Sequence, residues 1–585
     1  MTSAPGRIIT IPAVDGQDPL VRSYLEANRV TCAWRTIAWG WVVVGLLAGI
    51  IGAVLGGVVA VESIGVPLDL DDGQSPLVRS INRWLGHPFF SLAGMAVAGL
   101  VASTAGSLLR SRGVPAGQEP WWGVAVIALV YLLLYDPLAC LGVVVGGISL
   151  VYAVAILFRL TALLLGGGGG LRSSELPEPD GGWPVFTVLV PMYREREVAK
   201  NILINLAALD YPQDKLDVKF MLEADDSDTL PALQAAGIPA WAEAIVVPPG
   251  QPKTKPRACN HGLGTARGEF LVIFDAEDRP EPDQLKQAVL AFRRCAPRVV
   301  CLQARLAYHN HAQNLLTRWF ALEYNVWFRR YLGGLERMGV PIPLGGTSNH
   351  FRTAALRTLG GWDPFNVTED CDLGMRLHLS GLRTRCLNST TWEEANSRVG
   401  NWLRQRSRWL KGYMITHLVW GRRPLWLLRR LGPWPMLGFL LAVPAVPVLA
   451  AFNLILWAIA SVHAVLIAID LSRGFGLYEI LATRDHFHQR VSWQVWYQGT
   501  REQPTLAALS QVFAVAALVL LAGNLLFVLI TLIYGRRPDQ RGLGLAALLS
   551  PLYWVLIALA GWKGLWQLIV KPHYWEKTLH GLDQH

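Results

Sequence analysis

Charged residues are scarce in this sequence: of its 585 residues, only 16% are Asp, Glu, Lys or Arg, whereas 52% are hydrophobic. This shortage of charge, together with 24 tryptophans, excludes an ordinary soluble protein and indicates a protein with several membrane spans. A chain of this length is also expected to contain more than one domain.

Cysteine is sparse too, and no pair of cysteines has CxxC spacing. The seven positions are Cys32, Cys140, Cys259, Cys295, Cys301, Cys371 and Cys386. They predict reduced thiols and argue against a disulfide framework or a zinc site. No nucleic-acid-binding motif accompanies the net charge of +10, which basic span flanks and anionic lipid headgroups explain, so no nucleic-acid partner is expected.

Apolar runs of about 20 residues, the length needed to cross a bilayer, predict about eight spans. The runs are 37–61, 89–109, 121–165 (two spans), 431–471 (two spans, with a break near Pro444 and Pro447), 506–534 and 543–570. Residues 167–424 contain no run of that length, so they should fold outside the bilayer with a core of their own. The first run is too long and too far from Met1 for a signal peptide.

The domain order follows from these runs and from the arginines beside them. It comprises a cytoplasmic N-terminal segment (1–35), a bundle of about four spans (36–166), a linker (167–184), an α/β domain (185–424), a second bundle of about four spans (425–570) and a cytoplasmic tail (571–585). Arginines flank the central region, whereas the loop 62–88 is acidic, so the central domain should be cytoplasmic. The arginines in loop 535–541 conflict with this topology.

Strand-like and helical patterns alternate through the central region. Strands are expected at 185–190, 218–222, 243–247 and from 269, with helices at 196–208 and 257–266. This alternation predicts a parallel α/β sheet that is covered on both faces. Ligands bind beyond the carboxyl ends of such strands, which makes the strand ends candidate sites.

Acidic residues follow two of these strands. FLVIFDAED ends in Asp275, Glu277 and Asp278, which can hold a divalent cation on a diphosphate. LEADD supplies Glu223, Asp225 and Asp226, which can accept hydrogen bonds from a nucleobase or ribose. Taken alone, each cluster is more often an acidic surface turn.

Two further motifs have similar alternatives. KTKPRACN places Lys253, Lys255 and Arg257 at a helix N-terminus, which suits a phosphate but is also an ordinary basic loop. In TED, Asp370 at a helix start is either an N-cap or a general base. WLRQRSRWLKG (402–412) precedes an apolar stretch and is either a site or a basic-aromatic membrane anchor.

Taken together and in order, the motifs closely resemble those of the membrane-embedded family 2 glycosyltransferases, which include cellulose, curdlan, hyaluronan and chitin synthases. The motifs are PMYRERE (191–197), LEADD (222–226), KTKPRACN (253–260), FDAED (274–278), TED (368–370) and QRSRW (405–409). The resemblance covers residues 185–415 and the flanking spans. It implies a cytoplasmic GT-A-type α/β domain inserted between bundles of transmembrane helices.

The resemblance also implies a role for each matching residue. Pro191, Tyr193, Glu195, Glu223 and Asp225 would surround the uridine, and Lys255 would contact the nucleotide. Asp275 with Glu277 or Asp278 would bind Mg²⁺ or Mn²⁺. Asp370, beside Glu369, would be the base of an inverting transfer, and Gln405, Arg408 and Trp409 match the QxxRW motif of the diphosphate and acceptor site. In the tail, Trp575, Lys577 and Thr578 are candidates for a gating loop. DAED in place of DxD, and LEADD in place of DDG, leave the choices between Glu277 and Asp278 and between Glu223 and Asp225 open.

The predicted activity is therefore the polymerisation of a UDP-sugar into a β-linked polysaccharide that is translocated across the membrane. The expected partners are the UDP-sugar, the growing polysaccharide, the lipid bilayer and accessory export subunits, and the expected location is the bacterial inner membrane. One alternative is a single transfer to a lipid acceptor, which QRSRW and the number of spans disfavour. Another is an inactive scaffold or adsorption protein, which the acidic motifs disfavour. A transporter is disfavoured because the spans lack an internal repeat and carry almost no charge.

Overall fold

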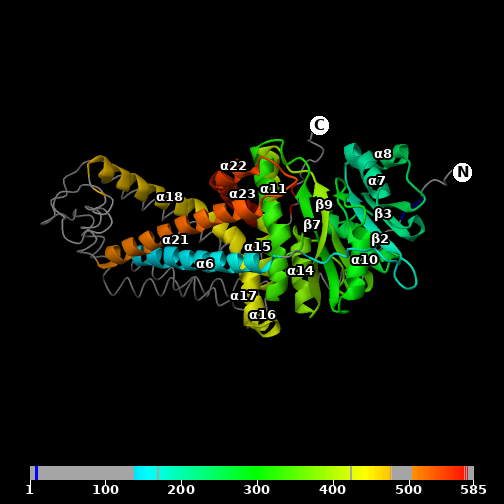
Figure 1. Cartoon of the computed structure of the whole chain (residues 1–585), viewed down its shortest axis with the longest axis horizontal. Helices are drawn as coiled ribbons and strands as arrows, with labels where there is room; N and C mark the ends of the chain where they lie inside the picture. The colour runs from blue at the N-terminus through cyan, green and yellow to red at the C-terminus, as the bar shows by residue number, and fades with distance from the viewer. Residues whose placement is uncertain are drawn as a thin grey trace. The chain divides into compact units, whose positions relative to one another are not determined.

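The computed structural model describes residues 7–10, 137–167, 170–421, 424–474, 476, 504–571, 574 and 576 (Figure 1). The predicted spans 37–61 and 89–109 lie outside the described residues, as do most of the N-terminal segment and part of 121–165. The candidate site belongs to one of the two compact units of the chain, a unit that includes residues 154–453 and 523–585.

A sheet forms the centre of this unit, and nine strands of it fall within the described ranges, in the order β1-β4-β3-β2-β5-β8-β7-β9-β6. The strands are β1 (Arg7–Thr10), β2 (Phe186–Met192), β3 (Leu216–Glu223), β4 (Ala242–Val247), β5 (Phe270–Ile273), β6 (Arg279–Pro280), β7 (Val299–Tyr308), β8 (Asn349–Arg352) and β9 (Arg383–Glu393). Strands β1 to β5 pair in parallel. Strand β8 runs antiparallel to β5 and β7, whereas β7 and β9 are parallel. The predicted parallel α/β sheet is thus confirmed for β2 to β5, and the second half is mixed.

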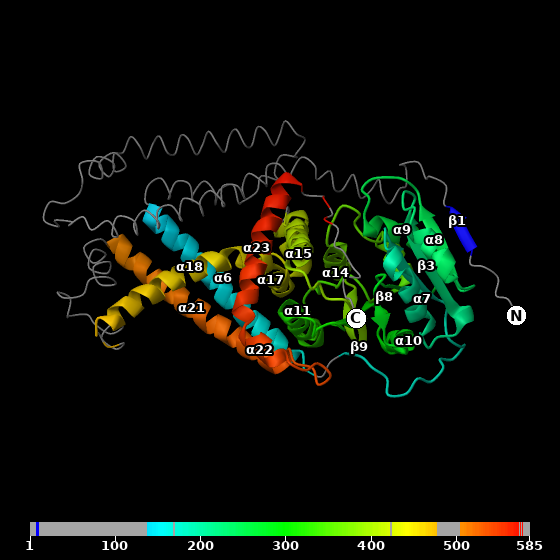
Figure 2. The same cartoon turned by 90° about the horizontal axis from the view of Figure 1, so that it is seen from above.

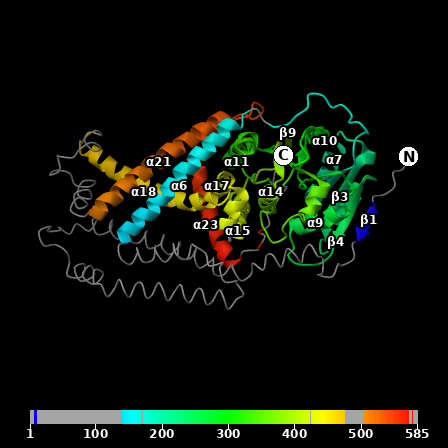
Figure 3. The same ribbon diagram turned by 90° about the horizontal axis from the view of Figure 1, so that it is seen from below.

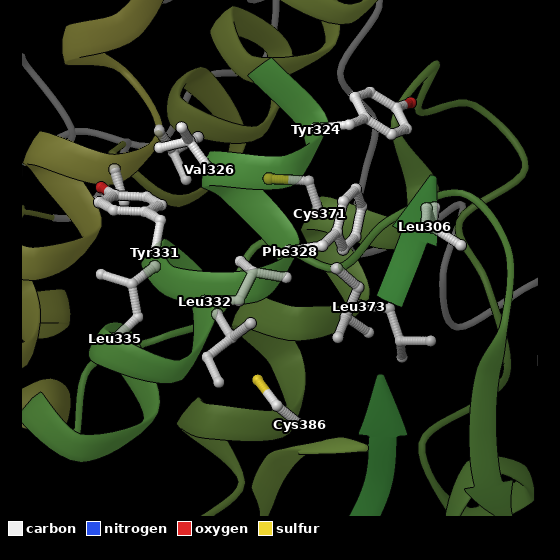
Figure 4. Close-up of a cluster of buried hydrophobic side chains, with 14 of the residues drawn as sticks. Leu306, Tyr324, Val326, Phe328, Tyr331, Leu332, Leu335, Cys371, Leu373 and Cys386 are labelled. Carbon is white, nitrogen blue, oxygen red and sulfur yellow. The ribbon is translucent and has the colours of Figure 1, made fainter. Parts of the chain in front are cut away.

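Helices cover both faces of the sheet. They are η1 (Arg196–Val198), α7 (Ala199–Ala207), η2 (Gln213–Lys215), α8 (Thr229–Ala236), α9 (Lys255–Thr265), α10 (Gln284–Arg294), α11 (Leu315–Val326), η3 (Trp327–Tyr331), α12 (Leu332–Met338), α13 (Thr353–Thr358), α14 (Glu369–Leu379) and α15 (Val399–Trp420). Along β2, Val188 and Val190 pack in one hydrophobic core with α7 and α10, whereas Leu189 packs with α9 in the other. Because both faces are buried, the strand reads as a continuous apolar run. Figure 4 shows part of the second core, where Tyr324 and Phe328 lie near Leu306.

Further helices flank this domain in sequence. They are α6 (Pro137–Leu165), α16 (Pro424–Leu431), α17 (Pro433–Ala442), α18 (Ala445–Ser472), α21 (Pro504–Tyr534), α22 (Leu543–Leu548) and α23 (Ser550–Val570). Within the described ranges, three helical segments are long and apolar enough to cross a membrane: 143–165, 516–534 and 550–570. The pair 433–442 and 445–455 bends by 47° and would be a fourth. The helix breaks near Pro444, where the sequence predicts the turn between two spans, but the bent pair would form one span and not two. The count of eight spans stays a prediction.

Helix α15, which carries WLRQRSRWLKG, lies close to both α14 and α23 (Figure 2; Figure 3). Two glycines permit these approaches. A Cβ on Gly412 would lie 2.3 Å from the side chain of Thr368, which caps α14, and a Cβ on Gly564 of α23 would lie 2.9 Å from the carbonyl oxygen of Ser407. The final glycine of the motif thus sets the distance between α15 and the start of α14.

Candidate active site

A cavity of about 390 Å³ lies between the carboxyl ends of β2, β3 and β5 on one side and α14 and α15 on the other. It brings together most of the residues that the sequence predicts for the site. Those that line it are Pro191, Tyr193, Glu195, Glu223, Lys255, Asp275, Glu277, Glu369, Asp370, Gln405, Arg408 and Trp409. Asp225 and Asp278 do not line the cavity, but each contacts a residue that does: Asp225 contacts Tyr193, and Asp278 contacts Thr347.

The loops after β2 and β3 are fixed to each other by Asp226. Its Oδ2 accepts hydrogen bonds from the main-chain N–H of Arg194 (2.6 Å) and the hydroxyl of Thr229 (2.7 Å), and its Oδ1 accepts one from the main-chain N–H of Thr229 (3.1 Å). Arg194 has a φ of 53°, an unfavourable value for a residue with a side chain. The bond to Asp226 therefore holds a strained turn beside Tyr193 in place.

Glu223 and Asp225, the two rival acidic residues after β3, occupy different environments. Glu223 lines the cavity with 8% of its surface exposed, lies 3.4 Å from the guanidinium of Arg257, and has its pKa raised by burial. The side chain of Asp225 is 60% exposed, pairs with Lys253 and accepts a hydrogen bond from the Tyr193 hydroxyl at 3.3 Å. The hydrogen bond from Lys253 lowers the pKa of Asp225. Glu223 is thus inside the cavity, and Asp225 is at its rim.

Lys255 is the first residue of α9, at a helix N-terminus as the sequence predicts. Its ammonium contacts the carboxylate of Asp275 and donates to the carbonyl oxygen of Gly346 at 2.8 Å. Burial alone would lower its pKa, but Asp275 and Glu369 raise it above the ordinary value. Lys255 is therefore a fixed positive charge between the strand ends and α14, where a phosphate group would be attracted.

The acidic turn after β5 divides its carboxylates between the cavity and the interior. Asp275 and Glu277 line the cavity. Asp278 is fully buried: its Oδ2 accepts from the main-chain N–H of Asp275 (2.9 Å) and contacts the Thr347 hydroxyl. Burial, followed by Asp275 and Glu277, raises the pKa of Asp278 well above its ordinary value. Asp278 thus supports the turn from behind, which favours Glu277 over Asp278 as the second carboxylate facing a ligand.

These carboxylates fit a Mg²⁺ or Mn²⁺ ion that also contacts a diphosphate. In the part of the chain that the structure describes, no group of three or more His, Cys, Asp or Glu side chains could hold a metal ion. Magnesium, however, is usually held by one or two carboxylates together with substrate phosphates. Asp275 and Glu277 provide such a pair of hard oxygen ligands at the cavity wall.

Asp370 lies in the first turn of α14, where its Oδ1 accepts a hydrogen bond from the main-chain N–H of Cys371 at 2.7 Å. Burial raises its pKa to about 6, although that hydrogen bond and Lys255 lower it. Glu369 is buried beside it, and burial and the charge of Asp370 raise the pKa of Glu369 further. At neutral pH, Asp370 is therefore the more readily ionised of the two and is suited to accept a proton.

Helix α15 brings Gln405, Arg408 and Trp409 to the same cavity. Burial lowers the pKa of Arg408, and the charges of Glu369 and Asp275 oppose this effect. The Oε1 of Gln405 accepts a hydrogen bond from Asn396 at 2.9 Å. The ring centroids of Trp409 and Tyr324 are 6.2 Å apart, so two aromatic rings line the cavity together with the guanidinium of Arg408.

Arg406 and Glu323 also line the cavity, but the sequence did not single them out. The guanidinium of Arg406 binds both carboxylate oxygens of Glu323, and the Tyr553 hydroxyl donates to Glu323 at 2.6 Å. Arg406 also lies 4.8 Å from the Trp409 ring centroid. This network joins α15 to α11 and α23. A local sequence pattern does not predict it, because its members are far apart in sequence.

Glu393, the last residue of β9, is a further cavity residue that the sequence did not single out. Applying the strand-end rule to TTWEE would have found it.

The predicted gating residues Trp575, Lys577 and Thr578 lie outside the described residues. Their described neighbours contact α15 and α23. Lys411 donates to the carbonyl oxygen of Tyr574 at 2.7 Å, while Glu576 accepts from Lys563 (3.0 Å) and Gln567 (2.7 Å). The gating role stays a prediction.

The sequence of this region matches a known enzyme family. Residues 270–470 match the family model described as glycosyl transferase family group 2. This match covers residues 270–470 of the 585 and supports the predicted enzyme family. The prediction of that enzyme family is confirmed, and the processive subtype is left open.

Two relatives of this chain differ in the products that their names state. A β-monoglucosyldiacylglycerol synthase of Trichormus variabilis is 29% identical over 289 residues, which cover 48% of this chain and 60% of the relative. A probable glucomannan 4-β-mannosyltransferase of Oryza sativa subsp. japonica is 30% identical over 251 residues, covering 41% of this chain and 43% of the relative. The aligned region thus spans less than two thirds of either relative.

Among solved structures, a mannosyltransferase from Pyrobaculum calidifontis in complex with GDP-Man and Mn²⁺ matches with a TM-score of 0.39 at 18% identity. The match covers 66% of this chain and 99% of that one, and a similarity this low says nothing about the donor or the metal of this chain.

Proposed function

We propose that the protein is an inverting, metal-dependent glycosyltransferase that adds sugars from a UDP-sugar to a β-linked polysaccharide and moves the product across a membrane. The observation that carries the proposal is the shared cavity of Asp275, Lys255, Asp370 and Arg408. It combines carboxylates, two half-buried cations and a carboxylate with a pKa of about 6, which are the groups that a displacement at a sugar diphosphate requires.

In this mechanism, Asp370 accepts the proton of the acceptor hydroxyl as its oxygen attacks the anomeric carbon. The bond between that carbon and the diphosphate breaks on the opposite face, which inverts the configuration. Lys255 and Arg408 stabilise the charge that develops on the leaving diphosphate. Glu223 and Tyr193 hold the nucleoside at the ends of β3 and β2.

Asp275 and Glu277 would hold the Mg²⁺ or Mn²⁺ ion, which when bound neutralises charge on the diphosphate. The contact between Lys255 and Asp275 places the ammonium group of Lys255 beside the carboxylate that would hold the ion.

Polymer synthesis and export rest on the apolar helices. The segments 143–165, 516–534 and 550–570 are each long and apolar enough to cross a membrane. Helix α15, which carries the predicted QxxRW residues, packs against the last of them, α23, through Gly564. Such an arrangement would put the acceptor site next to a membrane-spanning helix, with accessory export subunits as further partners.

A second candidate is transfer of a single sugar to a lipid alcohol. It is favoured by the names of relatives that are β-monoglucosyldiacylglycerol synthases. The cavity also has apolar lining, which includes Leu306, Phe328 and Val446.

The test measures nucleotide release by the full chain in nanodiscs, with a panel of UDP-sugars and Mg²⁺ or Mn²⁺, followed by sizing of the product. We expect Asp370→Asn to reduce transfer by about 10²- to 10⁴-fold, because it removes the general base, while donor binding is retained. The control is Asp210→Asn, an exposed carboxylate that pairs with Lys286. Undiminished transfer by Asp370→Asn would refute the proposed base. Long products identify a polymerase, and singly glycosylated lipid identifies the second candidate.

A further inference from the structure

Glu393 stands at the carboxyl end of β9 and lines the cavity, near the acidic turn after β5 and near Lys255. Strand β9 pairs in parallel with β7, and Glu393 is in register with Tyr308. The main-chain oxygen of Glu393 accepts a hydrogen bond from the N–H of His309 at 3.1 Å. The backbone of Glu393 is thus fixed by the sheet, and its side chain extends from a rigid position.

The carboxylate of Glu393 is not satisfied by the protein. Its Oε1 is buried and accepts no hydrogen bond from any residue that the structure describes. A buried acceptor without a donor costs about 1–3 kcal/mol, so such atoms are rare and call for an explanation. The nearby charged groups are the carboxylates of Asp278, Asp275 and Glu277, which disfavour a further anion, and the ammonium group of Lys255. A neutral donor from a ligand, such as a hydroxyl group, would complete this site.

The surroundings of Glu393 on the same side of the cavity combine aromatic rings and hydrogen-bonding groups. Tyr324 lies 4.3 Å from the ring of Tyr308 and 6.2 Å from that of Trp409. Gln405 lines the same cavity. Aromatic faces beside a carboxylate and an amide match a ring that has apolar C–H faces and hydroxyl edges.

We propose that Glu393 binds a second hydroxyl group of the acceptor, next to the hydroxyl that Asp370 deprotonates, and thereby selects a sugar acceptor over a lipid alcohol with a single hydroxyl. The inference rests on the proposed glycosyl transfer. It adds a specificity-determining residue on the acceptor side. A diacylglycerol has one free hydroxyl, which Asp370 would deprotonate. It would offer no second hydroxyl as a hydrogen-bond donor to Glu393.

The test combines altered acceptors with altered protein. The full chain in nanodiscs is given UDP-glucose or GDP-mannose, with Mn²⁺, and cellotriose, mannotriose, their monodeoxy analogues or diacylglycerol as acceptor. Wild type, Glu393→Gln and Glu393→Leu are compared, with Glu269→Gln as the matched control, because Glu269 is a partly exposed carboxylate that pairs with Arg293 outside the cavity lining.

We expect wild type to lose about 10- to 100-fold in kcat/KM on one monodeoxy acceptor, because the buried oxygen of Glu393 is then left without a donor. Glu393→Leu should lose a similar factor on the complete acceptor and should no longer distinguish it from that analogue. Glu393→Gln keeps the shape and one acceptor oxygen, so its loss should be smaller. The acceptor KM should rise more than the donor KM or the Mn²⁺ requirement.

Three results would overturn the inference. Wild type and Glu393→Leu could discriminate equally among the deoxy acceptors. The donor KM and Mn²⁺ requirement could rise as much as the acceptor KM, which would assign Glu393 to the donor. Diacylglycerol could be the preferred acceptor, with no change in Glu393→Leu. The deoxy acceptors test wild type without any substitution, and failure of wild type to cleave any nucleotide-sugar would overturn the proposed function as well.

Discussion

The two walls of the cavity differ in how the chain builds them. On the wall that we propose binds the donor, here called the donor wall, Glu223, Lys255 and Asp275 follow or precede elements of one parallel sheet and lie within about 50 residues of one another, as the spacing of adjacent βα units requires. On the wall that we propose binds the acceptor, here called the acceptor wall, Asp370, Trp409 and Glu393 are positioned by α14, α15 and β9, and a network from Glu323 to Tyr553 holds α15 in place. Donor-wall geometry is therefore local to the sheet, whereas acceptor-wall geometry depends on contacts between helices.

The largest effect that separates the walls is expected from Gly412→Ala. The new Cβ would lie 2.3 Å from the Thr368 side chain and force α15 and the start of α14 apart. A displacement of about 1 Å at Asp370 should reduce kcat by roughly 100-fold, with donor affinity unchanged. Steady-state kinetics and donor titration check this.

Gly400→Ala is the matched control for this substitution. Gly400 is on the same helix, and its Cβ would meet nothing within 4 Å. It should leave kcat unchanged and stabilise α15 slightly, by up to about 1 kcal/mol. Equal effects of the two substitutions would show that acceptor-wall geometry does not depend on this helix contact.

The next effect concerns pH. Asp370 must be ionised to accept a proton, and its pKa is raised to about 6. Below that value its protonated form dominates, so kcat should fall about tenfold per pH unit as the pH decreases. The same raised pKa makes the free energy of unfolding change in the opposite direction to kcat. The folded state favours the protonated form of Asp370, so its contribution to stability is lost as the pH rises through about 6. A pH profile of kcat that is flat between about 5 and 7 would contradict the assignment of Asp370 as the base.

The smallest effects should come from the two acidic residues after β3. Glu223→Gln removes a buried charge inside the cavity and should raise the donor KM by about tenfold, the cost of a charge-assisted hydrogen bond. Asp225→Asn alters a largely exposed side chain and should change the donor KM by less than about threefold. Donor titrations of both variants decide between the two residues. A larger effect at Asp225 would mean that the nucleoside is bound at the rim.

The strands and helices at 185–273 were predictable from the sequence because apolar runs end in Gly, Pro and charged residues, and strand ends are site positions in parallel sheets. The same rule did not separate Glu277 from Asp278, because their spacing in DAED is compatible with either facing the cavity. Only the turn after β5, which buries Asp278 against Thr347, distinguishes them.

The sequence by itself predicted the enzyme family and the α/β class of the central domain, and most of the site residues that it predicted line the cavity, because these depend on patterns within short stretches of chain. Only the tertiary structure decided which carboxylates face the cavity, how Arg406 fixes Trp409, and that Glu393 has a buried oxygen without a donor among the described residues. The physical reason is that burial and hydrogen-bond satisfaction are set by neighbours from distant parts of the chain, such as Tyr553 beside Glu323 and Arg406.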